Sequence, residues 1–212
     1  MKRFLFLICT VSLLAACNGS EKAPATSGDT IPKTDTLKDA LADLDPPSEI
    51  KQFKWIYSLF VKGITTKNEG GVFNKFIHPE NGLYIIESNG ALPQMVNVKD
   101  IEKFKSLQGA SFFILTRDDM ICDPADEELP TVNCDNKDFY SKSGCFTQES
   151  NSFKETKIWE AIHLESSEEK KVIAMAAGIT RTVINTKNYR FYFSLINGSW
   201  YISFIDMRKP CN

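Results

Sequence analysis

The sequence predicts an α+β domain over residues 48–212, in which N-terminal helices pack on a curved antiparallel sheet. Two patterns carry this prediction. Apolar residues recur at three- and four-residue spacing over residues 48–66, which is typical of a helix buried on one face. Further along, Asn-Gly pairs at 89–90 and 197–198 each separate two strand-like runs, and this dipeptide favours the turn of a β-hairpin.

The remaining elements are predicted from the same periodicities and from chain breakers. Helices are expected at 70–77 and 101–107, and strands at 83–87, 91–98, 111–116, 158–165 and 170–178, the last continuing to 184. The polar run 166–169 is interpreted as the turn between two of these strands. Pro93 marks its strand as an edge strand or a broken one, because proline has no N–H to donate to a neighbour.

The last hairpin is expected to join strands at 189–196 and 199–207. A two-residue turn places six apolar residues on one core face, in the pairs Leu195–Trp200, Phe193–Ile202 and Phe191–Phe204. The opposite face carries Tyr192 and Tyr201 among serines. We expect that face either to be solvated or to line a cavity.

The first seventeen residues have the layout of a secretory signal. Lys2 and Arg3 precede a short apolar run, and small residues end that run immediately before Cys17. A stable membrane-spanning helix needs about 20 apolar residues, so this run is too short to be one.

The segment Leu14-Ala15-Ala16-Cys17 resembles the lipobox of bacterial lipoproteins. The resemblance implies that residues 1–16 are removed, that the Cys17 thiol carries a diacylglycerol, and that the new amino terminus is acylated, for example by palmitate. Asn18 replaces the Asp that retains some lipoproteins at the inner membrane. We therefore expect a lipid anchor in the outer membrane of a Gram-negative cell envelope. The alternatives are an ordinary signal peptide with a chance cysteine, or a buried N-terminal helix.

Residues 17–47 are expected to form a flexible tether behind the lipidated cysteine, because Ser, Thr, Pro, Asp and Lys predominate there. The whole chain has 25 basic and 27 acidic residues. Removal of Lys2 and Arg3 leaves 23 basic residues and a formal net charge of −4. Nucleic-acid binding is not expected, because it requires a basic face.

Four cysteines remain in the mature chain after the lipidated one: Cys122, Cys134, Cys145 and Cys211. An even number in an exported protein predicts two disulfides, and four cysteines allow three pairings. Three of them lie in an irregular, Cys-rich insertion at 117–153, and we expect Cys211 to tie the C-terminus back to it. The spacing does not suit zinc, and no metal or cofactor is expected.

The element order resembles the NTF2-like, or cystatin-like, superfamily. The resemblance covers roughly residues 48–207 and depends on the 83–98 hairpin, the helix expected from residue 101, and the closing Asn-Gly-x-Trp-Tyr hairpin. It implies a strongly curved sheet with helices packed across it. Many such domains form dimers or enclose a conical pocket, and some are enzymes. No residues here match the catalytic set of those enzymes, and the Cys-rich insertion departs from the usual plan.

The candidate pocket residues are His163, Tyr192 and Tyr201. A histidine on a concave face serves as a general base or as a hydrogen-bond donor to a ligand, since its pKa lies near neutrality. The alternatives are a histidine that faces solvent and tyrosines that only pack across strands. We favour these alternatives, because the sequence offers no identifiable nucleophile.

Three functions are compatible with the sequence. We favour the first, a non-enzymatic binding or protein-interaction module held in the envelope, with an envelope protein or a small apolar ligand as partner. The second is an NTF2-like pocket enzyme or small-ligand-binding protein, and the third is a structural assembly subunit. Fold alone does not separate them, because function belongs to sites.

Overall fold

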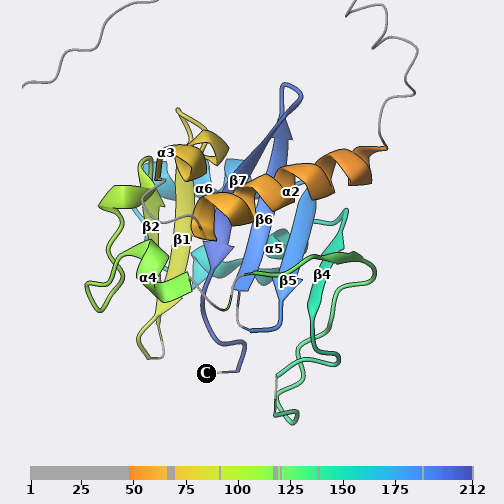
Figure 1. Ribbon diagram of the computed structural model, residues 1–212. Coiled ribbons are helices and arrows are strands. Elements are labelled where there is room, and N and C mark those ends of the chain that lie inside the picture. The colour runs from red at the N-terminus through yellow and green to blue at the C-terminus, as the bar shows by residue number, and fades with distance from the viewer. Residues whose placement is uncertain are drawn as a thin grey trace, which may run out of the picture. The chain divides into compact units, whose positions relative to one another are not determined.

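The computed structural model describes residues 48–65, 70–90, 92–116, 119, 121–137, 139–187 and 189–211 (Figure 1). The predicted signal segment, Cys17 and the tether up to residue 47 lie outside these residues. Within the described part, no helix is both long enough and apolar enough to cross a membrane.

The centre of the fold is a seven-stranded sheet with the order β2-β1-β7-β6-β5-β4-β3. Its strands are β1 (Leu83–Ser88), β2 (Pro93–Val98), β3 (Ala125–Asp126), β4 (Cys145–Gln148), β5 (Arg181–Asn185), β6 (Tyr189–Ile196) and β7 (Ser199–Asp206). The α+β class is confirmed. The expectation of a purely antiparallel sheet is wrong, because β1 pairs with β7, and β3 with β4, in parallel. Neither pair is joined by a tight hairpin, so no turn forces the two strands to run in opposite directions.

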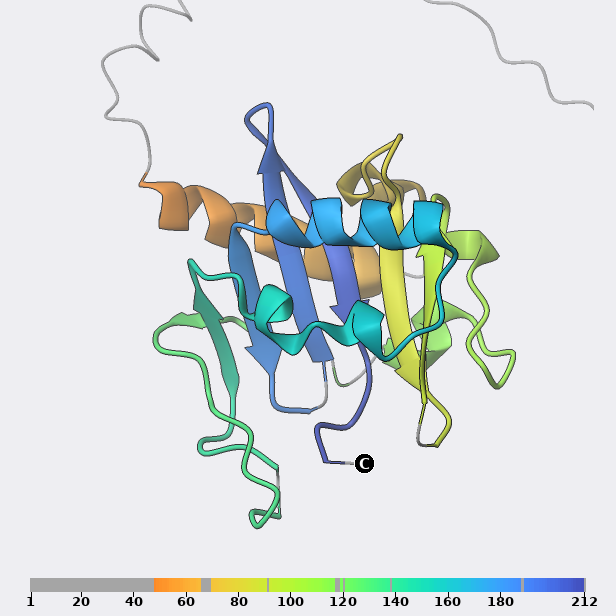
Figure 2. The ribbon, with the colours of Figure 1, turned by 180° about the vertical axis from the view of Figure 1, so that it is seen from behind.

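Helices cover both faces of the sheet (Figures 1 and 2). One face carries α2 (Glu49–Thr65), α3 (Gly70–Phe73), η1 (Asn74–Phe76), η2 (Ile101–Lys103) and α4 (Phe112–Thr116). The other carries α5 (Ser152–Thr156), η3 (Ile158–Glu160) and α6 (Ser166–Ala177). The fold is therefore three-layered.

Helix α2 forms as its apolar spacing predicts. Glu49 lies in its first turn and Lys62 in its last, where each charge interacts favourably with the helix dipole. Its buried stripe packs on β6 and β7. Phe53, for example, lies edge-on to Phe193 at 5.2 Å and to Trp200 at 5.0 Å between ring centroids. Aromatic rings thus fill the space between α2 and the sheet.

A bulge in the closing hairpin changes the face of the sheet on which the side chains beyond it lie. The pairs Leu195–Trp200 and Phe193–Ile202 form as predicted, but the register shifts next to Phe193. The predicted pairing of Phe191 with Phe204 is therefore wrong, and Tyr192 faces Phe204 instead. An extra residue in one strand turns the following side chains over. Phe204 consequently packs under α5, stacked on Phe153 at 4.1 Å.

The strands predicted at 158–165 and 170–178 are wrong, because this part of the chain forms η3, a loop and α6. The polar run expected to be a turn is the first turn of α6, where Glu168 and Glu169 favour the helix dipole. The alanines that follow have the highest helix propensity, and Val172 and Ala176 are buried one turn apart. The separate strand at the end of this region is β5.

Two predictions in the middle of the chain also need correction. Residues 112–116, expected to be a strand, form the short helix α4, and the helix expected at 101–107 is only the single turn η2. Phe112 packs edge-on to Phe73 at 5.2 Å and to Phe104 at 6.1 Å. These distant contacts override the strand propensity of the aromatic and branched residues.

The Cys-rich insertion is less irregular than predicted, because it contains β3, β4 and the start of α5. The two predicted disulfides are present as Cys122–Cys145 and Cys134–Cys211. The second ties the C-terminal segment to the insertion. The first joins the chain ahead of β3 to the beginning of β4.

Candidate ligand-binding groove

A groove of about 400 Å³ lies between α6 and the sheet. Its floor is made by β2, β1, β7 and β6, its roof by α6, and part of its rim by the turn that precedes β1. The lining residues are Glu80, Asn81, Tyr84, Asn97, Lys99, Glu168, Lys171, Ala174, Met175, Gly178, Ser194, Ile196 and Ser203.

The floor of the groove carries one polar residue from each of its four adjacent strands: Asn97, Tyr84, Ser203 and Ser194. Asn97 lies directly opposite Tyr84 in the β1–β2 pairing. Ser203 is the extra residue of the β7 bulge, and its hydroxyl shares a 2.7 Å hydrogen bond with that of Ser194. Beside this row the same sheet face is apolar, where Ile86, Tyr192 and Phe204 pack under the helices, with Phe153 of α5 stacked on Phe204. The polar row therefore borders an apolar cluster that packs against helices.

Tyr84 links the floor of the groove to its roof. Its hydroxyl donates a 2.5 Å hydrogen bond to Glu168 Oε1 on α6, and Lys171 Nζ donates to Glu168 Oε2 at 3.1 Å. Burial, followed by the hydrogen bond to Glu168, raises the pKa of the Tyr84 hydroxyl well above its usual range. The Tyr84 hydrogen bond is the main cause that lowers the pKa of Glu168, and Lys171 adds to it. At neutral pH the tyrosine therefore stays protonated and the glutamate stays charged.

Asn97, at the β2 end of the row, is held by the backbone of the turn that precedes β1. Its Nδ2 donates a 2.9 Å hydrogen bond to the Asn81 carbonyl. Gly82 lies beside it at φ +75°, and a Cβ on that residue would come within 2.5 Å of Asn97 Oδ1. Glycine is needed here both for the positive φ and for the space.

The charges around the groove are balanced. Glu80 and Glu168 contribute two carboxylates, and Lys99 and Lys171 contribute two ammonium groups. Apolar side chains of Met175 and Ile196 line the remaining wall. Such a lining favours a neutral or zwitterionic ligand that both donates and accepts hydrogen bonds.

None of the three pocket residues predicted from the sequence lines this groove. His163 is exposed in the loop between η3 and α6, not in a strand. Tyr192 is buried in the core beneath α5 and α6. Tyr201 is half-buried, with its ring 4.9 Å from that of His78.

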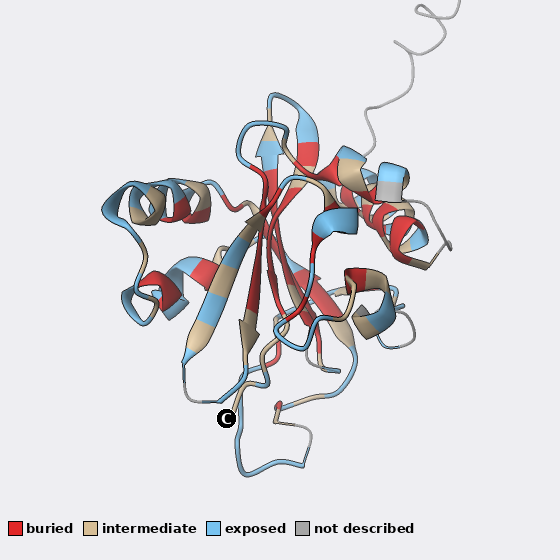
Figure 3. Ribbon diagram, turned by 90° about the vertical axis from the view of Figure 1, so that its left-hand side faces the viewer, coloured by how far each residue is buried: buried red, intermediate tan, exposed pale blue. Residues whose placement is uncertain are grey.

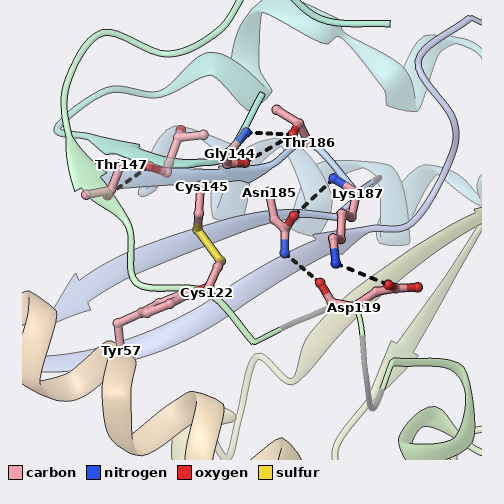
Figure 4. The surroundings of a disulfide bond; sticks show 10 residues. Tyr57, Asp119, Cys122, Gly144, Cys145, Thr147, Asn185, Thr186 and Lys187 are labelled. Carbon is pink, nitrogen blue, oxygen red and sulfur yellow. Dashed lines mark hydrogen bonds and ion pairs between the residues drawn. A yellow bond between two sulfur atoms is a disulfide. The ribbon is translucent and has the colours of Figure 1, made fainter. Parts of the chain in front are cut away.

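The Cys122–Cys145 disulfide lies at the opposite side of the sheet, beside α2 (Figure 4). The Tyr57 hydroxyl is 3.5 Å from Cys122 Sγ. Nearby, Asn185 donates a 2.8 Å hydrogen bond to the Asp119 carbonyl, and Lys187 Nζ lies 3.6 Å from the Asp119 carboxylate. Each contact ties the insertion to α2 or to β5 and the turn after it, so this region is structural.

Metal binding gains no support from the arrangement of side chains. Among the residues that the structure describes, no three His, Cys, Asp or Glu side chains gather closely enough to hold an ion. All four cysteines of the domain are engaged in disulfides.

Sequence reasoning missed the groove because its residues come from distant segments. Tyr84 and Glu168 are 84 positions apart, and Glu168 was interpreted as part of a turn. A useful signal was present in the closing hairpin, where Ser194 and Ser203 interrupt aromatic runs.

No family model, no curated protein and no solved structure matches this chain.

Proposed function

We propose that this protein is an envelope lipoprotein, anchored through Cys17, whose domain is a non-enzymatic binding module. Its ligand is a small polar molecule held in the groove between α6 and the sheet. The observation that carries the proposal is the row of four polar residues across the groove floor, beside the apolar cluster under α5 and α6. Buried polar groups cost stability unless they are hydrogen-bonded, and each residue of the row has a partner within the protein. The row therefore presents ordered polar groups to the groove, and we assign them to ligand recognition.

The packing of the opposite face supports a binding module over an enzyme with a conical pocket. Between α2 and the sheet, the aromatic side chains of Phe53, Tyr57 and Phe60 occupy the position where such a pocket would open. We propose an NTF2-like topology on the basis of element order alone, with that interior filled.

The chemistry of the groove also favours binding over catalysis. The Ser194 hydroxyl is paired with that of Ser203, so no base activates either one as a nucleophile. The histidines, His78 and His163, are not part of the lining. The polar floor favours a polar ligand over the apolar one that the sequence led us to expect.

Nuclear magnetic resonance titration of the mature domain tests this function. A zwitterionic dipeptide, a neutral monosaccharide and octanoate serve as probes of the three ligand classes. We expect the dipeptide or the monosaccharide to shift the amide signals of Lys171, Ala174 and Ser194, and octanoate to leave them in place.

A matched pair of variants on α6 locates the binding. Ala174 and Ala177 are both exposed, but only Ala174 lines the groove. Ala174→Trp is expected to fill the groove and abolish the shifts, whereas Ala177→Trp preserves them. Equal responses in the two variants, or shifts with octanoate alone, would refute the proposal.

A further inference from the structure

The β2 edge of the sheet is open. Strand β2 is the last in the order and pairs only with β1. Figure 3 looks onto this edge and shows β2 in front, with exposed and half-buried residues alternating along it. An edge strand presents backbone N–H and C=O groups that a further strand can pair with.

The composition of β2 leaves this edge poorly protected. Natural edge strands commonly carry charged residues or prolines that discourage pairing. Here Pro93 stands at the first position, and the five residues from Gln94 to Val98 are all uncharged. Val96 leaves 46% of its surface exposed on the face that α2 shares, and Leu92 just before the strand leaves 70% exposed. Val98 is buried, so the accessible stretch of edge runs from Gln94 to Asn97 and is partly apolar.

A basic groove runs beside this edge. It has a volume of about 580 Å³, and β2 and the segment after it line it. Lys99, Lys103 and Lys105 are exposed along it, and Val96 and Phe104 form part of its apolar wall. Asp100 is the single acidic residue of the lining and lies 3.7 Å from Lys103. The groove therefore has an excess of positive charge on a protein whose formal net charge is negative.

We propose that β2 is a docking site for an extended, acidic segment of another protein, which adds to the sheet as an eighth strand. Backbone hydrogen bonds to β2 hold the segment, its apolar side chains cover Val96, and its Asp or Glu side chains meet the three lysines. Charge complementarity selects an acidic segment, because a basic one would face three like charges. This surface and the groove beneath α6 meet at Asn97 and Lys99, which line both. The edge serves a macromolecular partner, whereas the groove beneath α6 takes a small ligand.

Fluorescence anisotropy with the full mature chain tests the proposal. The probe is a labelled eight-residue peptide of alternating valine and aspartate. Two comparison peptides isolate the two sources of affinity: one has lysine in place of aspartate, and the other keeps the aspartates but has N-methyl groups on alternate amides. We expect only the unmodified acidic peptide to bind, because strand addition needs both the charges and the free N–H groups.

Protein variants complete the test. Lys99→Glu, Lys103→Glu and Lys105→Glu together are expected to weaken binding by about tenfold or more. Lys154→Glu, Lys170→Glu and Lys209→Glu, which change three exposed lysines outside this groove, should leave it unchanged. Failure of the acidic peptide to bind, equal binding of the N-methylated peptide, or concentration-dependent dimers that bury β2 would each overturn the proposal.

Discussion

Tyr84 is the residue that connects the groove to the core. Its ring stacks on Phe204 at 5.5 Å, and its hydroxyl reaches Glu168 on α6. One side chain therefore packs in the sheet layer and holds the first turn of the helix that roofs the groove. A change at Tyr84 is expected to affect stability and groove shape together.

The Tyr84–Glu168 contact predicts a pH dependence of stability. The pKa of Glu168 is lowered in the folded state, so its contribution is present above the ordinary glutamate pKa of about 4.3 and is lost as the pH falls through the lower, folded value. Tyr84→Phe keeps the stacking but removes the donor. We expect about 1 kcal/mol less stability at pH 7 and a shallower decline below pH 5 (about the range where glutamates titrate), measured by denaturant unfolding. An unchanged acid profile would contradict this role.

Asp206 organises the end of β7. Its carboxylate is 2% exposed and lies 3.1 Å from Arg190 and 2.8 Å from Arg208. A buried pair that loses one partner leaves an uncompensated charge. Asp206→Asn is therefore expected to lower the free energy of unfolding by about 3 to 5 kcal/mol in urea melts.

The matched comparison for Asp206 is Asp119→Asn, which removes an exposed carboxylate 3.6 Å from Lys187. Exposed ion pairs contribute about 1 kcal/mol or less, so this variant should unfold almost as the wild type does. Similar losses in both variants would show that burial of the Asp206 network is unimportant.

At the scale of elements, the sequence was most informative where local signals agreed. The α2 stripe and the two-residue turn of the closing hairpin were predicted correctly, since each depends on spacing or on nearby residues. The two disulfides were predicted from the even number of cysteines, without their pairing. The first Asn-Gly hairpin forms with a longer loop than expected, because Ser88 pairs with Pro93. Helix α6 was missed because its polar first turn resembles a loop when read alone. The bulge at Ser203 was missed because the alternation in β7 shows no break before the partner strand is known.

The two disulfides are expected to contribute different amounts to the free energy of unfolding. In the chain-entropy account, stabilisation grows with the length of the closed loop. Cys134–Cys211 spans 77 positions and Cys122–Cys145 spans 23. Replacing the first pair with serines is expected to cost about 4 kcal/mol, and the second about 3 kcal/mol, in denaturant unfolding. A larger loss for the shorter loop would mean that contacts around it, such as that with Tyr57, outweigh the entropy.

For the whole molecule, both faces of the sheet are covered by helices and filled mainly with aromatic rings, and this was only partly predictable. The abundance of phenylalanine indicated a large core, with 15 in the chain. The division of those residues between two layers depends on the β7 bulge and on α6, neither of which was predicted. The candidate groove lies at the place where those two features meet.

The proposed anchor makes a prediction for the whole protein in its cell. Cys17→Ser removes the thiol that would carry the diacylglycerol, so we expect the variant to leave the membrane fraction and remain soluble in the envelope. Fractionation followed by immunoblotting measures this. Persistence of the variant in the membrane pellet after a high-salt wash would argue that something other than a lipid holds the protein there.

The most direct test of the central claim, that the groove binds a small polar ligand, is native mass spectrometry of the protein purified from its own cells. The account predicts one small polar molecule per chain on the wild type and on Ala177→Trp, and none on Ala174→Trp. The absence of any bound molecule from all three proteins, or its equal presence on Ala174→Trp, would contradict the account.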